Sequence, residues 1–524
     1  MSQDYLMGLD FGGGGGRCLL VGLDDGRLTS AFRAWHFEAD PDLPIATNID
    51  VAATWSLLGE AVREAMDRAG AAPERVVGIG TTSMRHGSVI LDAQGDEILA
   101  APNRDARGIG QIGQLATDHG EAIHRRTGHW PNPVAPAGRL LWMAEHAPEA
   151  LSKASAHLSL SDWLAYRLCG EIATEPSQAC ETLLFDLETR DWAWDWIDRL
   201  DLPRAVFPAV RAAGTRLGAI TDRAATGLGL RAGTPVAVGG ADTQCGLLGA
   251  VAIAPGQVGA VLGTTAPLQQ VLDRPIADPE ARLWGVHHVV PGLWALESNA
   301  GGLGEALEWI AGVLYADVDH PVVHLLAEAA ESEPGAAGAV STVGAEVMNA
   351  RQFGLPVGNL TLSPITASRD PRRRRHVARA VCEGMAFALR ANLEQLLAAS
   401  GLETPTLRVG GGLSRSRFFT QLLSDVTQRP VDVAAAESSA LGAAICGGVG
   451  AGLFRDLEQA AGKLVRMERR QTPDRERGPV YEELYAGWEG LRRARRETDA
   501  AAAGLVIRGL AAASSSATAS KAST

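Results

Sequence analysis

Lysine is the residue that this 524-residue sequence contains least often. Only three lysines occur, at Lys153, Lys463 and Lys521. No segment reads GxxxxGK[ST], so a P-loop, which meets nucleotide phosphates with a lysine, is excluded. Any phosphate that this chain binds must therefore be met by backbone amides, by arginine or by a metal ion.

Cysteine is also scarce, and its spacing excludes two kinds of site. The six cysteines stand singly without a CxxC pair, which argues against a zinc site or a disulfide framework. They are typical of reduced core residues, so we predict a cytoplasmic protein. His287 and His288 are neighbours on a predicted strand and point to opposite faces, which favours ordinary strand residues over a metal pair.

Long apolar runs and an excess of basic charge are absent as well. No run is long enough to cross a bilayer, and we expect no signal peptide and no membrane partner. The net charge of −13 argues against a nucleic-acid partner. The one arginine run, 372–375, follows the helix-start signal Asp370-Pro371, so we predict that it forms the solvated first turn of a helix.

The most informative segment is the turn that ends at Asp242. A short apolar strand, 235–238, runs into Gly239-Gly240-Ala241-Asp242, and a second turn, Gly263-Thr264-Thr265, follows about twenty residues later. Hydroxyls and amides of the second turn suit phosphate oxygens. A carboxylate base beside a phosphate cradle is what phosphoryl transfer to an alcohol requires. The alternative is that Asp242 merely caps the following helix.

The N-terminus repeats this arrangement. A strand, 5–9, is followed by Asp10, by the glycine run 12–16 with Arg17, and by a second strand, 18–23. Strand, glycine loop and strand form a hairpin, whereas a dinucleotide-binding fingerprint leads into a helix. A hairpin turn points backbone N–H groups at an anion, and Asp10 is placed to hold Mg²⁺ through water. A flexible glycine turn is the simpler alternative.

A third glycine turn lies near the C-terminus. The sequence predicts a strand at 406–409, a turn at Gly410-Gly411-Gly412, a helix at 414–425 and a strand at 431–433. Glycines leave room for a flat ring such as adenine to lie on the backbone. The alternative is that the three glycines simply make a tight strand-to-helix turn.

The order of these elements predicts an α/β protein with two related halves, each opening with a hairpin. We expect a domain over 1–248 that binds sugar and carries the phosphate hairpin, with Asp242 at its end, a nucleotide-binding domain over 249–495, and a disordered tail over 510–524. We also predict a strand at 76–80 and a hairpin that starts at 87–91. Residues 139–170 and 192–230 are predicted to be helical.

Several motifs in this order resemble the FGGY family of carbohydrate kinases. The resemblance rests on LDFGGGGGR, SMRHG, PNRDARG, GGADTQCG, LGTT and RVGGGLSRSRFFTQLLSDVTQRPVDV, and it spans residues 9–452. It implies two actin-like (ribonuclease H-like) domains with an interdomain active-site cleft that closes on ATP and a sugar. The runs SMRHG and LSDWLAYRLCGE most resemble the autoinducer-2 kinase subgroup, with xylulokinases next.

The resemblance implies roles for individual residues. Asp242 is the expected base, Asp10 holds Mg²⁺, and the remaining expected residues fall into two sets. The phosphate and nucleotide set is Gly12, Gly13, Gly14, Arg17, Gly263, Thr264, Thr265, Gly411, Gly412 and Arg415. The sugar set is Arg85, His86 and Asp105.

The expected cofactors are thus ATP and Mg²⁺, and the expected partner is a small sugar, ketose or polyol; a homodimer is left open. The substrate implied is similar to dihydroxypentanedione or to xylulose. Arg107 is an alternative ion-pair partner for Asp105, and His86 is alternatively a donor to a local carbonyl.

Departures from the family leave a second function open. The family usually has threonine and serine where this chain has Gly13, Gly14 and Gly15, and glycine where Leu362 stands. The alternative function is therefore a catalytically weak sugar- or nucleotide-binding regulatory protein with the same fold. A dehydrogenase is disfavoured because the glycine loops open hairpins.

Overall fold

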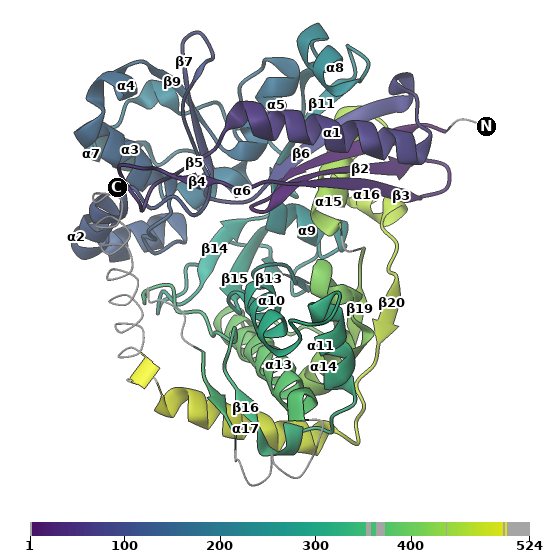
Figure 1. Cartoon of the computed structure of the whole chain (residues 1–524). Coiled ribbons are helices and arrows are strands. Elements are labelled where there is room, and N and C mark those ends of the chain that lie inside the picture. The colour runs from purple at the N-terminus through teal and green to yellow at the C-terminus, as the bar shows by residue number, and fades with distance from the viewer. Residues whose placement is uncertain (1–2, 353–357, 363–372, 436, 496–497, 500–524) are drawn as a thin grey trace, which may run out of the picture.

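Two mixed sheets form the centre of the molecule. The computed structural model describes residues 3–352, 358–362, 373–435, 437–495 and 498–499 (Figure 1). The first sheet has the order β10 (Arg216–Ala219), β11 (Pro235–Ala241), β6 (Val76–Ser83), β1 (Tyr5–Phe11), β2 (Gly15–Gly22) and β3 (Leu28–Ala34). The second has the order β14 (Trp284–His287), β15 (Trp294–Asn299), β13 (Pro267–Leu272), β12 (Val258–Val261), β18 (Leu407–Gly410), β19 (Val431–Val433) and β20 (Arg469–Gln471). The order β3-β2-β1-β6-β11-β10 of the first corresponds to β15-β13-β12-β18-β19-β20 of the second, which has β14 as an additional edge strand.

Each sheet combines an antiparallel hairpin with parallel strands. β1 pairs antiparallel with β2 and parallel with β6, and β12 pairs antiparallel with β13 and parallel with β18. Both predicted opening hairpins are confirmed, and the repeated order confirms two related halves. The first glycine run forms the β1–β2 turn, in which the Gly12 amide donates to the Gly15 carbonyl at 3.0 Å.

Helices cover the sheets and join the two halves. Those of the first half are α1 (Val51–Ala69), α2 (Ile109–Thr127), α3 (Pro136–His146), α4 (Pro148–Ser152), α5 (Leu160–Cys169), α6 (Pro176–Ala179), α7 (Trp194–Arg199), α8 (Asp222–Leu228) and α9 (Asp242–Gly249). Those of the second are α10 (Leu303–Leu314), α11 (Pro321–Ala330), α13 (Arg373–Ser400), α14 (Arg417–Thr427), α15 (Ser438–Gly450), α16 (Leu457–Leu464) and α17 (Gly478–Ala494).

Short 3₁₀ turns and small sheets complete the chain. The turns are η1 (Pro73–Arg75), η2 (Cys180–Thr182), η3 (Arg204–Val206), η4 (Ala336–Gly338) and η5 (Gly412–Arg415). A three-stranded sheet holds β8 (Glu97–Ala101), β7 (Ser88–Asp92) and β9 (Ala154–Leu158), and two pairs are β4 (Glu38–Ala39) with β5 (Thr47–Asn48) and β16 (Val340–Ser341) with β17 (Leu360–Thr361).

Two helix predictions are wrong in part. Within 139–170 the segment Ala154–Leu158 is strand β9, because it pairs with β7, the first strand of the correctly predicted hairpin. Within 192–230 the segment Arg216–Ala219 is strand β10, which pairs with β11. In both cases pairing with another strand overrides the local preference of the segment.

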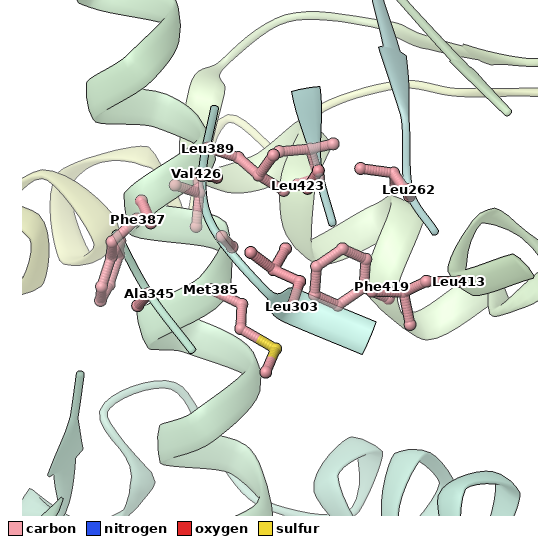
Figure 2. Packing of buried hydrophobic residues seen from close by; sticks show 14 of the residues in the cluster. Leu262, Leu303, Ala345, Met385, Phe387, Leu389, Leu413, Phe419, Leu423 and Val426 are labelled. Atoms are coloured by element: carbon pink, nitrogen blue, oxygen red, sulfur yellow. The ribbon is translucent and has the colours of Figure 1, made fainter. Parts of the chain in front are cut away.

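The long helix α13 anchors the core of the second half. Its apolar side chains pack against α10, α14 and the loops beside them, with Leu389 beside Leu423 and Met385 beside Leu303 (Figure 2). Phe387 packs against the rings of Tyr485 and Trp488. The described part of this helix begins at Arg373, and Arg373 and Arg374 are exposed, in keeping with the predicted solvated turn. The predicted cap Asp370-Pro371, Arg372 and the tail 510–524 lie outside the described residues.

Helix α15 of the second half lies directly on the first sheet. Glycines at Gly8 and Gly80 face the carbonyl oxygens of Ala440 and Ala443, where any Cβ would overlap the helix backbone. This close approach fixes the ends of β1 and β6 relative to the second half. In the described part of the chain no helix is long and apolar enough to cross a membrane.

Candidate active site

Two aspartates lie at one edge of the first sheet. β1, β6 and β11 run parallel, and Thr82 of β6 stands opposite Asp10 on one side and Gly240 on the other. Asp242 follows β11 as the first residue of α9. Because the carboxyl ends of parallel strands meet at one edge, the fold brings Asp10 and Asp242 together.

Both carboxylates have a raised proton affinity. Burial raises the pKa of Asp10 to about 7; the charge of Asp242 adds to this effect and Arg17 opposes it. Burial also raises the pKa of Asp242 to about 6, against the charge of Arg85 and a hydrogen bond from the Thr243 amide. A carboxylate with a pKa near 6 is ionised at neutral pH and is a stronger base than an ordinary aspartate.

Asp242 is not the cap of its helix. Ala241 is the N-cap of α9, and Asp242 Oδ1 accepts a hydrogen bond from the amide of its own neighbour Thr243 at 2.7 Å. A capping side chain would instead stand at the N-cap position and bond amides two or three residues further on. The carboxylate of Asp242 is therefore not used to cap α9 and is available for a catalytic role.

Arg85 links the two halves of the protein beside Asp242. It follows β6, and its Nη1 and Nη2 each donate to the Glu297 carboxylate on β15 at 2.7 Å. Nη1 also donates to Glu181 Oε1 at 3.1 Å. Gln269 of β13 donates to Glu297 and lies 3.4 Å from the Thr243 hydroxyl. One guanidinium thus holds two buried carboxylates from distant segments.

His86 and His129 face the second oxygen of Glu181. Each Nε2 atom lies 3.3 Å from Glu181 Oε2. His86 has a backbone φ of 60°. Residues other than glycine rarely adopt this conformation, and where they do they are concentrated at functional sites. Trp284 packs against both rings and against Arg85. The local-carbonyl alternative for His86 is not what the structure shows.

Asp105 lies in a buried ion-pair network. Arg107 Nε donates to both carboxylate oxygens, at 2.9 and 3.0 Å, and Arg139 Nε donates to Oδ2 at 2.7 Å. The Thr47 amide donates to Oδ1 at 2.9 Å. Arg139 also bonds the His86 carbonyl. The ion-pair alternative with Arg107 is confirmed, and the direct sugar contact of Asp105 stays a prediction.

Glu437 contacts the arginines that follow the first and third glycine turns. The second and third turns touch, since Gly411 has φ 89° and a Cβ there would lie 2.7 Å from the Leu262 carbonyl oxygen. Arg415 Nη2 donates to Glu437 Oε1 at 2.8 Å, and Arg17 Nη1 lies 3.4 Å from the same oxygen.

Each of the three glycine turns has residues with open space beside them. Thr264 and Thr265 are exposed. A Cβ at Gly14 or Gly412 would meet no atom within 4 Å. Open amides and hydroxyls of this kind suit the phosphates of a nucleotide.

The histidine and cysteine predictions agree with the structure. His287 and His288 each hydrogen-bond a backbone carbonyl, of Asp186 and Ala252. All six cysteines are free and buried. Among the described residues no cluster of three or more His, Cys, Asp or Glu side chains suits a metal ion.

The comparison with known families defines the class of protein. Residues 5–249 match the N-terminal domain and residues 258–451 the C-terminal domain of the FGGY family of carbohydrate kinases. The chain therefore belongs to this family and is a carbohydrate kinase, a phosphotransferase with an alcohol group as acceptor. FGGY kinases use ATP with Mg²⁺.

Individual relatives cover nearly the whole chain. The chain is 34% identical over 505 residues to autoinducer-2 kinase of Escherichia coli (strain K12), covering 94% of each sequence. Xylulose kinase from Rhodospirillum rubrum is 28% identical, with a TM-score of 0.79 over 94% of this chain and 99% of that one. Gluconate kinase from Lactobacillus acidophilus, at 20% identity, shares the fold with a TM-score of 0.82, covering 96% and 100%.

The residues at the sheet edge fit a divalent ion. Asp10 Oδ1 is buried and has no hydrogen-bond partner. An orphaned carboxylate oxygen that faces a second carboxylate is a donor set that Mg²⁺ accepts, directly or through water. Burial is the largest cause of both raised pKa values, and the charge of Asp242 adds to it at Asp10, so a cation bound at this edge would favour the ionised carboxylates.

Several residues of this site were not predicted from the sequence. They are Glu181, Glu297, His129, Gln269 and Trp284. The signal for the two glutamates is a single acidic residue inside an apolar run, CETLLF and WALESN. A charge that interrupts a buried element needs a partner, but the sequence does not say which one.

Proposed function

We propose that this kinase phosphorylates a hydroxyl of a small neutral ketose or polyol, similar to dihydroxypentanedione or xylulose, with Asp242 as the base. The observation that carries the proposal is the position of Asp242. On one side is Asp10, whose Oδ1 has no hydrogen-bond partner, and on the other is Arg85 with its buried partners Glu181 and Glu297. Support for the substrate comes from the likeness to autoinducer-2 kinase over nearly the whole chain.

In the proposed mechanism Asp242 accepts the proton of the attacking hydroxyl. Its raised pKa of about 6 brings its basicity closer to neutral pH while leaving it ionised. Arg85 opposes that rise and keeps the carboxylate charged. Bound Mg²⁺-ATP supplies the phosphoryl group and neutralises its charge. Asp10 would hold the metal, and the glycine turns with Arg17, Thr264, Thr265 and Arg415 would hold the phosphates.

The two halves divide these tasks in our proposal. Residues 1–248 bind the sugar and carry the phosphate hairpin, and residues 249–495 bind the nucleotide, with Gly411 and Gly412 at the adenine. Gly412 supports this assignment because the space beside its Cα is open. We further propose a cytoplasmic location, which the six free cysteines support. The homodimer that the sequence leaves open is tested by light scattering after size exclusion.

A coupled ADP-release screen tests the function directly. The panel holds dihydroxypentanedione, pentuloses, tetritols and glycerol, each with Mg²⁺-ATP. We expect turnover on an open-chain ketose or polyol and no turnover in excess chelator. Binding of ATP and a sugar without any ADP release would favour the regulatory alternative, which the glycine-only first loop keeps open.

A further inference from the structure

The peptide bond between Gly240 and Ala241, just before Asp242, is held at both ends by side-chain hydroxyls. The Thr82 hydroxyl donates to the Gly240 carbonyl at 2.8 Å. At the other end the Ala241 amide donates to the Ser177 hydroxyl at 3.0 Å. The pairing of β11 with β6 shifts in register just before this peptide, and such a shift disrupts the regular ladder locally. Side chains therefore fix the peptide at the point where the strand leads into the turn.

A buried carboxyl decides where the Ser177 hydroxyl points. Because the Ser177 oxygen accepts the Ala241 amide, its own hydrogen must go to another acceptor. That acceptor is Glu175 Oε2, to which the Ser177 hydroxyl and, at 2.7 Å, the Ser177 amide both donate. Both residues are buried against the turn, since a Cβ at Gly240 would lie 3.1 Å from Glu175 Oε2.

A second buried carboxyl, Asp162 of α5, holds the segment that carries Glu175. Its Oδ2 accepts a hydrogen bond from the Thr174 hydroxyl at 3.0 Å. Burial raises the pKa of Glu175 to about 8; hydrogen bonds from Ser177 oppose the rise and the charge of Asp162 adds to it. Glu175 is therefore largely uncharged at neutral pH, so it orients Ser177 without placing a further negative charge beside Asp242.

Capping of helix α6 accounts for only part of this arrangement. Glu175 is the N-cap of α6 and accepts the Ser177 amide. That cap requires no hydroxyl at position 177. The Ala241 amide, which the hydroxyl accepts, belongs to β11 and lies 64 residues further along the chain. A purely local cap thus predicts that the Ser177 hydroxyl has no effect on the chemistry of Asp242.

We propose that Ser177 and Glu175 are positioning residues for Asp242. Glu175 orients the Ser177 hydroxyl, which together with that of Thr82 fixes the peptide that precedes the base. Rotation of this peptide would swing the Asp242 carboxylate away from the attacking hydroxyl, and a misplacement on the order of 1 Å costs about a hundredfold in rate. The inference rests on the proposed function, in which Asp242 is the base, and adds the residues that hold it.

Ser177→Ala tests this role, with Ser424→Ala as the matched control. Ser424 of α14 is equally buried, and its hydroxyl donates to the Arg429 carbonyl at 2.8 Å, in the second half of the protein. We expect Ser177→Ala to lower kcat by at least about tenfold while the KM values for sugar and ATP stay within about twofold. Ser424→Ala should leave kcat unchanged. Wild-type kcat in the Ser177 variant would overturn the proposal.

Two further substitutions separate a positioning role from a loss of folding. Glutamine at position 175 keeps an uncharged acceptor, whereas methionine keeps only the approximate length. We expect Glu175→Gln to retain kcat within about threefold and Glu175→Met to lose as much as Ser177→Ala. Equal kcat values for the two would overturn the role of Glu175. If Ser177→Ala does not fold, Thr82→Val, which removes the hydroxyl at the other end of the peptide, is measured against the same expectation.

The double variant Asp242→Asn/Ser177→Ala asks whether Ser177 acts through Asp242. We expect its kcat to lie within about twofold of that of Asp242→Asn alone, because misplacing a base costs nothing once the base is gone. Losses that multiply in the double variant would show that Ser177 acts elsewhere and would overturn the proposal.

The two proposals fail differently. Full activity of Asp242→Asn overturns the base assignment and the positioning role with it, whereas a large loss in Asp242→Asn without one in Ser177→Ala overturns the positioning role alone. If no sugar is phosphorylated, amide hydrogen exchange decides. Faster exchange at Ala241 in Ser177→Ala, and not in Ser424→Ala, supports the positioning contact, and unchanged exchange overturns it.

Discussion

At the scale of single residues, burial decides the chemistry of the aspartates. Burial raises the pKa of both Asp10 and Asp242; the charge of Asp242 adds to the rise at Asp10, and Arg85 opposes the rise at Asp242. Asp105, by contrast, is held by two arginines and a backbone amide. Three residues of one type thus have three different environments, and each environment yields its own expectation.

Asp242→Asn keeps the size and hydrogen bonding of the side chain but removes its ability to accept a proton. We expect kcat to fall by at least about a hundredfold, the usual scale for a positioned base. Affinity for sugar and ATP should change little. In the wild type, kcat/KM should decline as pH falls through about 6, where Asp242 becomes protonated. A variant that retains most of its kcat would refute the assignment.

Asp10→Asn should have two separate effects: greater stability of the metal-free protein and a weaker response of activity to Mg²⁺. The pKa of Asp10 is about 7 in the fold, above the 3.8 of an unperturbed aspartate, so the folded state binds the proton more tightly and loses stability as pH rises between these values. Without metal, the variant should therefore gain stability over the wild type progressively from about pH 4 to 7. Melting curves with chelator measure this gain. With Mg²⁺, the variant should need more metal for activity, and an identical Mg²⁺ dependence would contradict the metal role.

Asp105→Ala distinguishes a sugar contact from an ion-pair partner. Removing the carboxylate leaves Arg107 and Arg139 buried without their partner, which costs about 3–5 kcal/mol of unfolding free energy. Chemical denaturation measures this loss. Arg415→Ala, at the exposed third turn, serves as a control that should disturb nucleotide affinity first. Unchanged stability with a raised sugar KM would show that Asp105 contacts the sugar instead.

At the scale of elements, the glycines of the first hairpin differ in how much space surrounds their Cα atoms. Gly14 is exposed and a Cβ there meets nothing within 4 Å, whereas a Cβ at Gly16 would lie 2.6 Å from the Trp35 ring. The outer turn is therefore free to accept a side chain, and the strand end is not.

Gly14→Ser and Gly16→Ser form a matched pair on this hairpin. We expect Gly14→Ser to keep the wild-type melting temperature. Its affinity for ATP should equal or exceed that of the wild type, because the new hydroxyl adds a donor beside the phosphates. Gly16→Ser should lose about 1–3 kcal/mol through overpacking against Trp35. Differential scanning calorimetry and ATP titration compare the two. Equal melting temperatures would contradict the packing described for Gly16.

At the scale of the whole molecule, helix α15 and the Arg85 pair hold the two halves together. α15 belongs to the second half but lies on β1 and β6 of the first, where Gly8 and Gly80 admit its backbone. Arg85 and Glu297 join the halves at the candidate site itself. Displacing the helix should therefore disturb the site from a distance.

Gly80→Ala tests this connection. Its Cβ would overlap the Ala443 carbonyl oxygen, so we expect a loss of about 3 kcal/mol of stability and a lower kcat/KM, although Gly80 touches no substrate. Gly113→Ala on the exposed face of α2 is the control and should gain about 0.5–1 kcal/mol. Urea denaturation and steady-state kinetics give both readouts. A Gly80 variant as active and stable as the wild type would contradict the close contact of α15.

Local features of the sequence predicted part of the architecture. Glycine turns between apolar strands predicted both opening hairpins, since backbone freedom and alternation act over a few residues. The strands β9 and β10 were missed, because each is held as a strand by pairing with another strand, β7 or β11, that lies outside the segment predicted as helix.

The sequence by itself determined the two related halves, the three glycine turns and the places of Asp10 and Asp242 at strand ends. Only the tertiary structure decided which charges meet: Arg85 joins Glu297 across 212 residues, and Glu181 receives His86 and His129 from two other loops. A buried charge must find a partner, but the partner is chosen by the distance between folded elements, which no local pattern encodes.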